Sequence, residues 1–205
     1  RKLSVEDYGR FEGAGVHYAA TAMEGQLCGG EEVVVVGGGN SAGQAAVFLS
    51  RIADHVHMMV RSGGLAATMS DYLVQRIEQS PKITLYTHSQ ICKLEGPDRL
   101  RQVSWVHRDT GEVITRLIGN VFVMIGAEPN TDWLQGCVEL DDKGFVITGK
   151  AIPGTVPSTY LTSRPGIFAV GDVRSGSVKR VASGVGEGSV VIQAVHQFLA
   201  PPTGL

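Results

Sequence analysis

Four consecutive valines at positions 33–36, followed at once by three glycines, constrain the fold of this chain more than any other stretch. A short β-branched run that is apolar on both faces is typical of a buried parallel strand. A helical segment from about Ser41 to Ala53 follows, with apolar residues spaced for one inward face. A second apolar run at residues 56–60 completes the unit. This order predicts a β-α-β unit, and therefore an α/β fold.

The turn between the first strand and the helix fits the pattern G-x-G-x-x-A. Glycine at the first position permits the tight turn, and glycine at the third lets the backbone approach a pyrophosphate. The alanine lets helix and strand pack closely, and the helix N-terminus supplies free N–H groups. The predicted dinucleotide-binding residues are Gly37, Gly38, Gly39, Asn40, Ser41 and Ala42. A glycine-rich turn in another kind of α/β protein is the alternative, but both flanks and the crossover length favour a dinucleotide.

The end of the second strand indicates which dinucleotide is bound. An acidic side chain there would bind the ribose of NAD, whereas an arginine accommodates the 2′-phosphate of NADP. The chain reads Val60-Arg61-Ser62-Gly63-Gly64 at this point, with no carboxylate. We therefore expect Arg61 and Ser62 to lie at the 2′-phosphate of NADP(H), while the use of NADH stays open.

Further apolar segments extend this unit. They predict a helix over residues 72–77 capped by Thr68 or Ser70, a strand at 83–87, an antiparallel meander of 91–95, 100–107 and 112–117, and a buried strand at 121–125. The result is a Rossmann-like, three-layer dinucleotide-binding domain with a β-meander crossover. Ile125 and Gly126, where the last strand stops, join the predicted cofactor-binding residues.

Composition excludes several classes of function. The 205 residues are 43% hydrophobic and 19% charged, which allows a buried core. The net charge of −2, with scattered basic residues, argues against a nucleic-acid partner, and no apolar run is long enough to span a membrane. The three cysteines lie far apart without metal-binding spacing, which predicts no metal site and a reduced, cytoplasmic setting.

After residue 129 the sequence changes in character. Residues 140–147 predict a hairpin, residues 166–172 a buried strand ending in Gly171-Asp172, and residues 189–198 an apolar helix. One hairpin, one strand and one helix cannot enclose a core by themselves. We expect this tail to be part of a second domain whose other part is absent from the chain.

Three motifs make a known family recognisable: the glycine turn at 37–42, Ile125-Gly126-Ala127-Glu128-Pro129-Asn130-Thr131, and the segment at 162–172 ending in Gly-Asp. On these residues the chain resembles, nearly end to end, the low-molecular-weight thioredoxin reductases, which are FAD-dependent pyridine nucleotide-disulfide oxidoreductases. The resemblance implies a hinge or linker at 1–15, an NADPH-binding domain at 16–128, and the C-terminal portion of an FAD-binding domain at 129–205. It also implies that an N-terminal FAD segment of the family is missing.

The resemblance implies flavin contacts in the tail. Asp172, after Gly171, would hydrogen-bond the ribityl chain of FAD. Arg180, Val181 and Ala182 would open the helix whose N-terminus faces the isoalloxazine ring, where its dipole favours negative charge. For Asp172, a turn or helix-capping role is the alternative.

The chain departs from the family at its redox centre. The family's C-A-T-C pair falls at Ala19-Ala20-Thr21-Ala22, so alanine replaces both cysteines. Passing electrons to a disulfide needs one thiolate to attack and a second thiol to resolve the mixed disulfide, and alanine does neither. Cys28, a lone thiol six residues beyond Ala22, cannot replace the pair and is expected to be a small apolar residue. The resemblance therefore leaves the catalytic residues unknown.

These observations favour a thioredoxin reductase-like flavoprotein oxidoreductase, in which hydride passes from NADPH to FAD and on to an unidentified acceptor other than an internal dithiol. An NADP(H)-binding regulatory or scaffold module without turnover would also lack both cysteines. A general NADP dehydrogenase is a weaker third reading, because no polar catalytic set is visible. Since the family dimerises through its FAD domain, the resemblance also makes a homodimer one option.

Overall fold

The structure is a computed structural model that describes residues 1–150 and 158–200. The chain divides into two compact units, Arg1–Gly126 and Ala127–Leu205. The division lies close to the predicted domain boundary after residue 128. None of the helices in the described ranges is long and apolar enough to cross a membrane.

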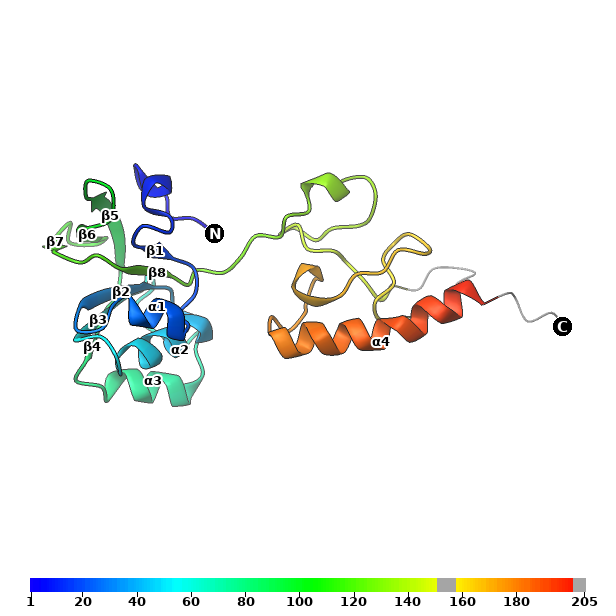
Figure 1. The fold of residues 1–205 in the computed structure, drawn as a ribbon, viewed down its shortest axis with the longest axis horizontal. Coiled ribbons are helices and arrows are strands. Elements are labelled where there is room, and N and C mark those ends of the chain that lie inside the picture. Colours follow the sequence, from blue (N-terminus) through cyan, green and yellow to red (C-terminus); the bar gives the residue numbers. More distant parts are fainter. Residues whose placement is uncertain (151–157, 201–205) are drawn as a thin grey trace. The chain divides into compact units, whose positions relative to one another are not determined.

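The first unit is organised around a five-stranded sheet in which every pair of neighbouring strands is parallel (Figure 1). Its order is β1-β8-β2-β3-β4. The bounds are Val16–His17 for β1, Glu32–Val36 for β2, His55–Met59 for β3, Ile83–Tyr86 for β4 and Val121–Val123 for β8. The valine run is therefore the central strand of the sheet, as predicted, with hydrogen-bonded neighbours on both sides.

The valines of β2 explain why the unit has three layers. Val33 and Val35 belong to the core beneath the helices, whereas Val34 and Val36 belong to the core beneath the meander. Side chains alternate between the faces of a strand, so a run that is apolar at every position needs cover on both faces. The predicted Rossmann-like α/β fold is confirmed.

The helical layer consists of α1 (Ala22–Gln26), α2 (Asn40–Leu49) and α3 (Asp71–Glu78). Buried alanines at positions 42, 45 and 46 let α2 lie close to the sheet. The helix expected to reach Ala53 ends at Leu49. Its last turn tightens through 3₁₀-type bonds, with the Arg51 N–H donating to the Phe48 carbonyl and the Ile52 N–H donating to the Leu49 carbonyl.

The opposite face of the sheet carries the meander of β5 (Ser89–Glu95), β6 (Gln102–His107) and β7 (Val113–Arg116), all antiparallel. It forms the crossover between β4 and β8, as predicted. Trp105 on β6 is 1% exposed and is the largest side chain in this layer's core.

The segment 1–15, predicted as a hinge or linker, lies within the first unit. It contains a short 3₁₀ helix, η1 (Tyr8–Phe11), whose two terminal residues are buried in the meander-side core. Phe11 is fully buried, and the Ala14 carbonyl accepts a hydrogen bond from the Leu100 N–H at 2.8 Å. The described segment therefore packs as core rather than as a free connection.

The second unit has little regular structure besides one long helix, α4 (Val181–Leu199), which begins eight residues before the predicted start at 189. Two 3₁₀ turns, η2 (Asp132–Leu134) and η3 (Gly171–Val173), accompany it. The hairpin predicted at 140–147 forms a single antiparallel bridge between Leu140 and Val146.

The buried strand predicted at 166–172 is wrong. Phe168 forms one isolated bridge with Leu161, Ile167 is 36% exposed, and the last two residues of the segment belong to η3. A strand needs a partner along its length to satisfy its N–H and C=O groups. The described residues of this unit offer that segment only one bridge, so its apolar sequence does not form a ladder here.

Candidate nucleotide- and flavin-binding site

The carboxyl ends of the parallel strands bring several predicted residues to one edge of the sheet. Register pairs Val36 at the end of β2 with Met59 on β3 and Val123 on β8. The turn at 37–42, the loop starting at Arg61 and the segment at 125–126 therefore leave the sheet side by side. Because the chain runs from β2 to β3 on one side and returns as β8 on the other, this is the switch point where α/β sheets bind ligands.

Gly37 makes a turn that only glycine accommodates. Its φ is +142°, and a Cβ there would lie 2.4 Å from the carbonyl oxygen of Met124. Its N–H donates to the Met59 carbonyl at 3.0 Å, which fixes the turn between two strands. The tight turn expected of the first glycine is present.

The N-terminus of α2 is open. Gly39 is the N-cap residue, has no side-chain cap, and has no atom within 4 Å of its Cβ position. Asn40 and Ser41 are exposed, and the first turn carries no acidic side chain. The first N–H groups of a helix lack intrahelical partners and lie at its positive dipole end. This end of α2 therefore suits an anion such as a pyrophosphate.

Two side chains from the loop before α3 brace the glycine turn. Thr68 Oγ1 donates to the Gly38 carbonyl at 2.7 Å. Asn40 Oδ1 accepts from the Ser70 N–H at 2.8 Å and lies 3.1 Å from the Ser70 hydroxyl. Ser70 holds the N-cap position of α3, but its side chain does not cap that helix. Sequence reasoning missed the brace, because the partners lie 30 residues apart.

Arg61 and Ser62 are both exposed after β3. Within residues 1–150 and 158–200, no hydrogen bond or ion pair engages the Arg61 guanidinium, so it is available to an anion. The Ser62 hydroxyl donates to the Gly64 carbonyl at 2.9 Å and would have to rotate to reach a phosphate. On the far side of β2, Ile125 packs against the meander-side core and Gly126 turns with φ +89°.

In the second unit, a partly buried ion pair fixes the Gly-Asp turn to α4. The Gly171 N–H donates to Glu187 Oε2 at 2.7 Å, and Arg174 contacts the same carboxylate with Nη2 at 2.5 Å and Nε at 3.3 Å. These hydrogen bonds, from Arg174 first and then from Gly171, hold the pKa of Glu187 below its usual range. A Cβ on Gly171 would lie 3.7 Å from the Cα of Gly184, so turn and helix touch. The sequence analysis did not single out Arg174 or Glu187. A carboxylate within an otherwise apolar helix could have indicated that Glu187 has a partner.

The residues assigned to flavin by resemblance lie at the exposed end of this assembly. Asp172 is exposed, and its carboxylate has no hydrogen-bond partner in the described part of the chain, while its carbonyl accepts from Lys179 Nζ at 3.2 Å. Arg180 is the N-cap residue of α4 without a side-chain cap, and Val181 and Ala182 follow it, exposed. A free carboxylate beside an uncapped N-terminus of a 19-residue helix fits the hydroxyls and the reducible ring of a flavin.

The alanines at the family's redox positions lie at the surface. Ala19 and Ala22 are exposed at the start of α1, where Thr21 and Glu24 form a capping box. Cys28 is fully buried, and its burial raises the pKa of the thiol. The structure therefore places Cys28 in the core, which agrees with the predicted apolar role, and there it cannot serve as an exposed nucleophile.

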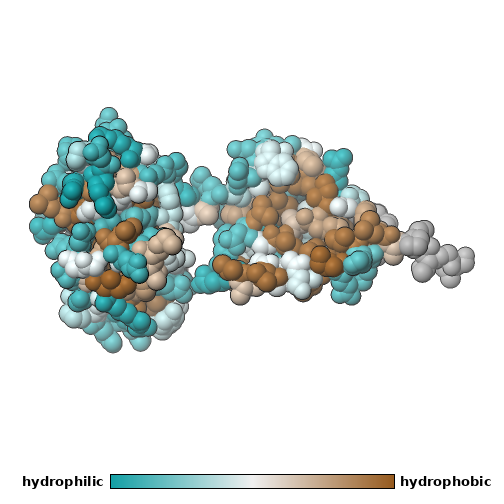
Figure 2. Space-filling model, in the orientation of Figure 1, coloured by the Kyte–Doolittle hydropathy of each residue, from teal (hydrophilic) through white to brown (hydrophobic). Residues whose placement is uncertain are grey.

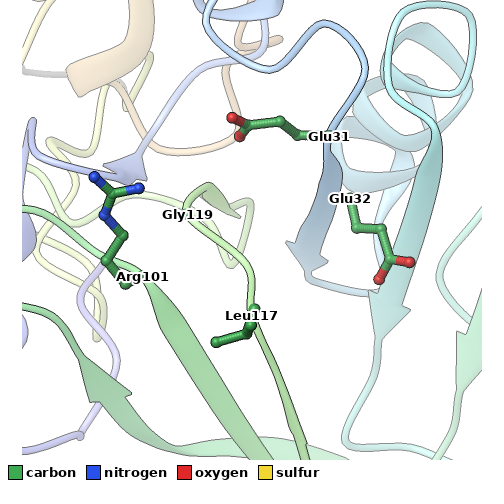
Figure 3. Close-up of a pocket in the computed structure, with 5 residues that line it drawn as sticks. All are labelled: Glu31, Glu32, Arg101, Leu117 and Gly119. Carbon is green, nitrogen blue, oxygen red and sulfur yellow. The ribbon is translucent and has the colours of Figure 1, made fainter.

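A cavity of about 350 Å³ lies at the opposite, amino edge of the sheet (Figure 3). Glu31 and Glu32 line it at the start of β2, with Arg101, Leu117 and Gly119. Each carboxylate already has a partner: Glu31 accepts from Asn120 Nδ2 at 3.0 Å, and Glu32 lies 2.9 Å from His57 Nε2. Two carboxylates repel a pyrophosphate, so this cavity is not the dinucleotide site.

Comparison with known proteins agrees with this arrangement. The family model described as pyridine nucleotide-disulphide oxidoreductase matches residues 2–188. The thioredoxin reductase of Chlamydia pneumoniae is 34% identical over 169 residues, which cover 82% of this chain and 51% of that protein. The NADH dehydrogenase of Bacillus subtilis strain 168 is 31% identical over 199 residues, which cover 97% of this chain and 37% of that protein.

A solved structure extends the likeness to three dimensions. Thioredoxin reductase of Lactococcus lactis superimposes with a TM-score of 0.80 at 28% identity, covering 97% of this chain and 62% of that one. The chain thus spans about a third to three-fifths of the length of these and similar curated relatives. Match and geometry together show that the chain belongs to the pyridine nucleotide-disulphide oxidoreductase family and is thioredoxin reductase-like within it.

Proposed function

We propose that the whole protein is a flavoprotein oxidoreductase that takes hydride from NADPH onto FAD and passes the electrons to an acceptor other than an internal dithiol. One observation carries the proposal. The chain has an open helix N-terminus at the sheet switch point, at the start of α2, and a free carboxylate, Asp172, beside the open N-terminus of α4. It also has alanine at both positions of the family's redox cysteines.

The first unit would hold the nicotinamide nucleotide. The N–H groups at the start of α2 would bind the pyrophosphate, and Gly39 leaves room for it because no atom lies within 4 Å of its Cβ position. Arg61 would bind the 2′-phosphate, since the loop carries no carboxylate to repel it. Relatives named NADH dehydrogenase make the choice between NADPH and NADH a point for experiment.

The second unit would hold part of the flavin. Asp172 would accept hydrogen bonds from ribityl hydroxyls, and the start of α4 would face the ring, where bound FAD supplies the capacity to accept a hydride. Apolar side chains of α4 lie exposed, and Figure 2 shows apolar surface on this unit. They are Val181, Val185, Val190, Ile192, Phe198 and Leu199. We propose that the N-terminal FAD segment expected from the family covers them.

The loss of the dithiol excludes one route for the electrons. Ala19 and Ala22 cannot form a mixed disulfide, and Cys28 is buried. The electrons would therefore leave from the flavin to a separate acceptor. A nucleotide-binding module without turnover is the second candidate, because the same two alanines favour it equally.

The test uses the whole protein that contains this chain. Its visible spectrum would be recorded, and NADPH and NADH would be added separately in the absence of oxygen. We expect a yellow protein whose flavin absorbance is lost with NADPH. A colourless protein that still binds NADPH would favour the module without turnover, and a flavin that neither nucleotide reduces would overturn the proposed hydride transfer.

A further inference from the structure

The neighbouring strand β4 brings a histidine to the loop that carries Arg61. The register of β3 and β4 pairs Met59 with Tyr86, so two residues further on Arg61 and His88 leave the same edge of the sheet. The backbone ties the two segments together. The His88 N–H donates to the Ser62 carbonyl at 3.1 Å, and the Ser89 N–H donates to the Val60 carbonyl at 3.0 Å.

His88 adopts a left-handed backbone conformation. Its φ is +48°, in a region that is uncommon for residues other than glycine but in which asparagine, aspartate and histidine are enriched. The structure enforces it from both sides, because the His88 carbonyl also accepts from the Arg108 N–H at 2.7 Å. These two hydrogen bonds fix the backbone of His88 and therefore the position from which its ring projects.

The ring of His88 is aimed at the loop after β3. Its Nδ1 lies 3.0 Å from Asp109 Oδ2, which fixes the orientation of the imidazole. A Cβ on Gly63 would lie 2.9 Å from Nε2, so this nitrogen sits directly over the loop. The side chain is 42% exposed, which leaves the ring accessible to a ligand bound there.

We propose that His88 is a specificity-determining residue that, together with Arg61, binds the 2′-phosphate of NADP(H); this inference rests on the proposed binding of a dinucleotide at the glycine turn. Nδ1 faces Asp109, so the N–H on that nitrogen would be donated to the carboxylate. Nε2, when it carries a proton, would donate a second hydrogen bond to a phosphate oxygen. A second hydrogen-bonding side chain, from the turn after β4, thus accompanies the single arginine of the loop.

The test is His88→Asn in the 205-residue chain, with dissociation constants for NADPH and NADH measured by titration of their fluorescence. Asparagine tolerates the left-handed conformation, so the backbone is kept while the imidazole is removed. We expect the dissociation constant of NADPH to rise about tenfold, as for the loss of a charge-assisted hydrogen bond, and that of NADH to change less than about twofold.

The matched control is His55→Asn, which removes a histidine from the opposite end of β3, where Nε2 contacts Thr84 Oγ1 at 2.8 Å. We expect neither dissociation constant to change. An unaltered NADPH-to-NADH ratio in His88→Asn would overturn the inference and leave dinucleotide binding intact. Failure of the unsubstituted chain to bind either nucleotide would instead refute the binding of a dinucleotide at the glycine turn, on which the proposed function depends, so the two failures are distinguishable.

Discussion

The two units of this chain differ in how fully they bury their own apolar surface. The first covers both faces of a parallel sheet, and all four valines of β2 are buried. Among the described residues of the second, the buried apolar side chains are Val138, Phe145, Val146, Leu161 and Val191. Its α4 contributes only the last of them, while Val181 is 87% exposed. The predicted nucleotide site therefore belongs to a unit that has its own core. The predicted flavin contacts belong to a unit whose long helix leaves most of its apolar side chains exposed.

The largest effect is expected at Phe11, which tests whether the first unit includes its N-terminal segment. Phe11→Ala removes a fully buried ring and should lower the free energy of unfolding by about 3–5 kcal/mol. Urea unfolding followed by Trp105 fluorescence in a Trp133→Phe background would measure it, since the chain has two tryptophans. Phe11→Leu, which keeps most of the apolar volume, should lose less than about 1.5 kcal/mol. A loss below 1 kcal/mol for Phe11→Ala would restore the linker interpretation.

A second substitution tests whether a change in the nucleotide turn affects the first unit without affecting the second. Gly37→Val places a branched side chain where φ is +142° and the Met124 carbonyl oxygen is 2.4 Å from the Cβ position. We expect a loss of about 3 kcal/mol in the first unit and loss of NADPH binding, without a change in hydrogen exchange of α4. Gly39→Ala, in open space with φ −95°, should lose less than about 1 kcal/mol. Equal stability for the two variants would contradict the role assigned to Gly37.

The smallest effect is expected in the second unit. Glu187→Gln removes the charge that Arg174 and the Gly171 N–H contact, and should destabilise α4 by about 1 kcal/mol, because part of the ion pair reaches water. Amide hydrogen exchange along α4 measures this loss. Val185→Ser, a change on the exposed face of the same helix, should stay within about 0.5 kcal/mol. Protection that is unchanged in Glu187→Gln would show that the ion pair does not hold the helix.

The same carboxylate gives the second unit a defined response to acid. The folded pKa of Glu187 lies below its unfolded value of about 4.3, so its contribution is complete above that value. Stability is then lost as the pH falls through the folded pKa. We expect the protection of α4 to fall below about pH 4.3, and to fall less in Glu187→Gln. An identical acid response in both proteins would contradict this assignment.

Prediction from sequence was most reliable where a local sequence pattern agrees with the packing that surrounds the segment in the fold. The valine run, the glycine turn and the meander each carry their own signal, and the structure contains all three. It failed at 166–172, where an apolar run predicts a strand but the described residues supply one bridging partner. A β-strand forms only when a second segment pairs with it. An apolar run that is typical of strands therefore does not by itself determine that a strand forms.

The sequence by itself determined the parallel β-α-β order, the need for glycine at the turn, and the absence of a dithiol at Ala19 and Ala22, because these depend on local period, backbone freedom and covalent identity. Only the tertiary structure decided that Thr68 braces Gly38, that His88 lies over the loop of Arg61, and that Glu187 fixes Gly171. Those contacts join residues from different elements. Their geometry follows from strand register and from the packing of layers, which no local pattern encodes.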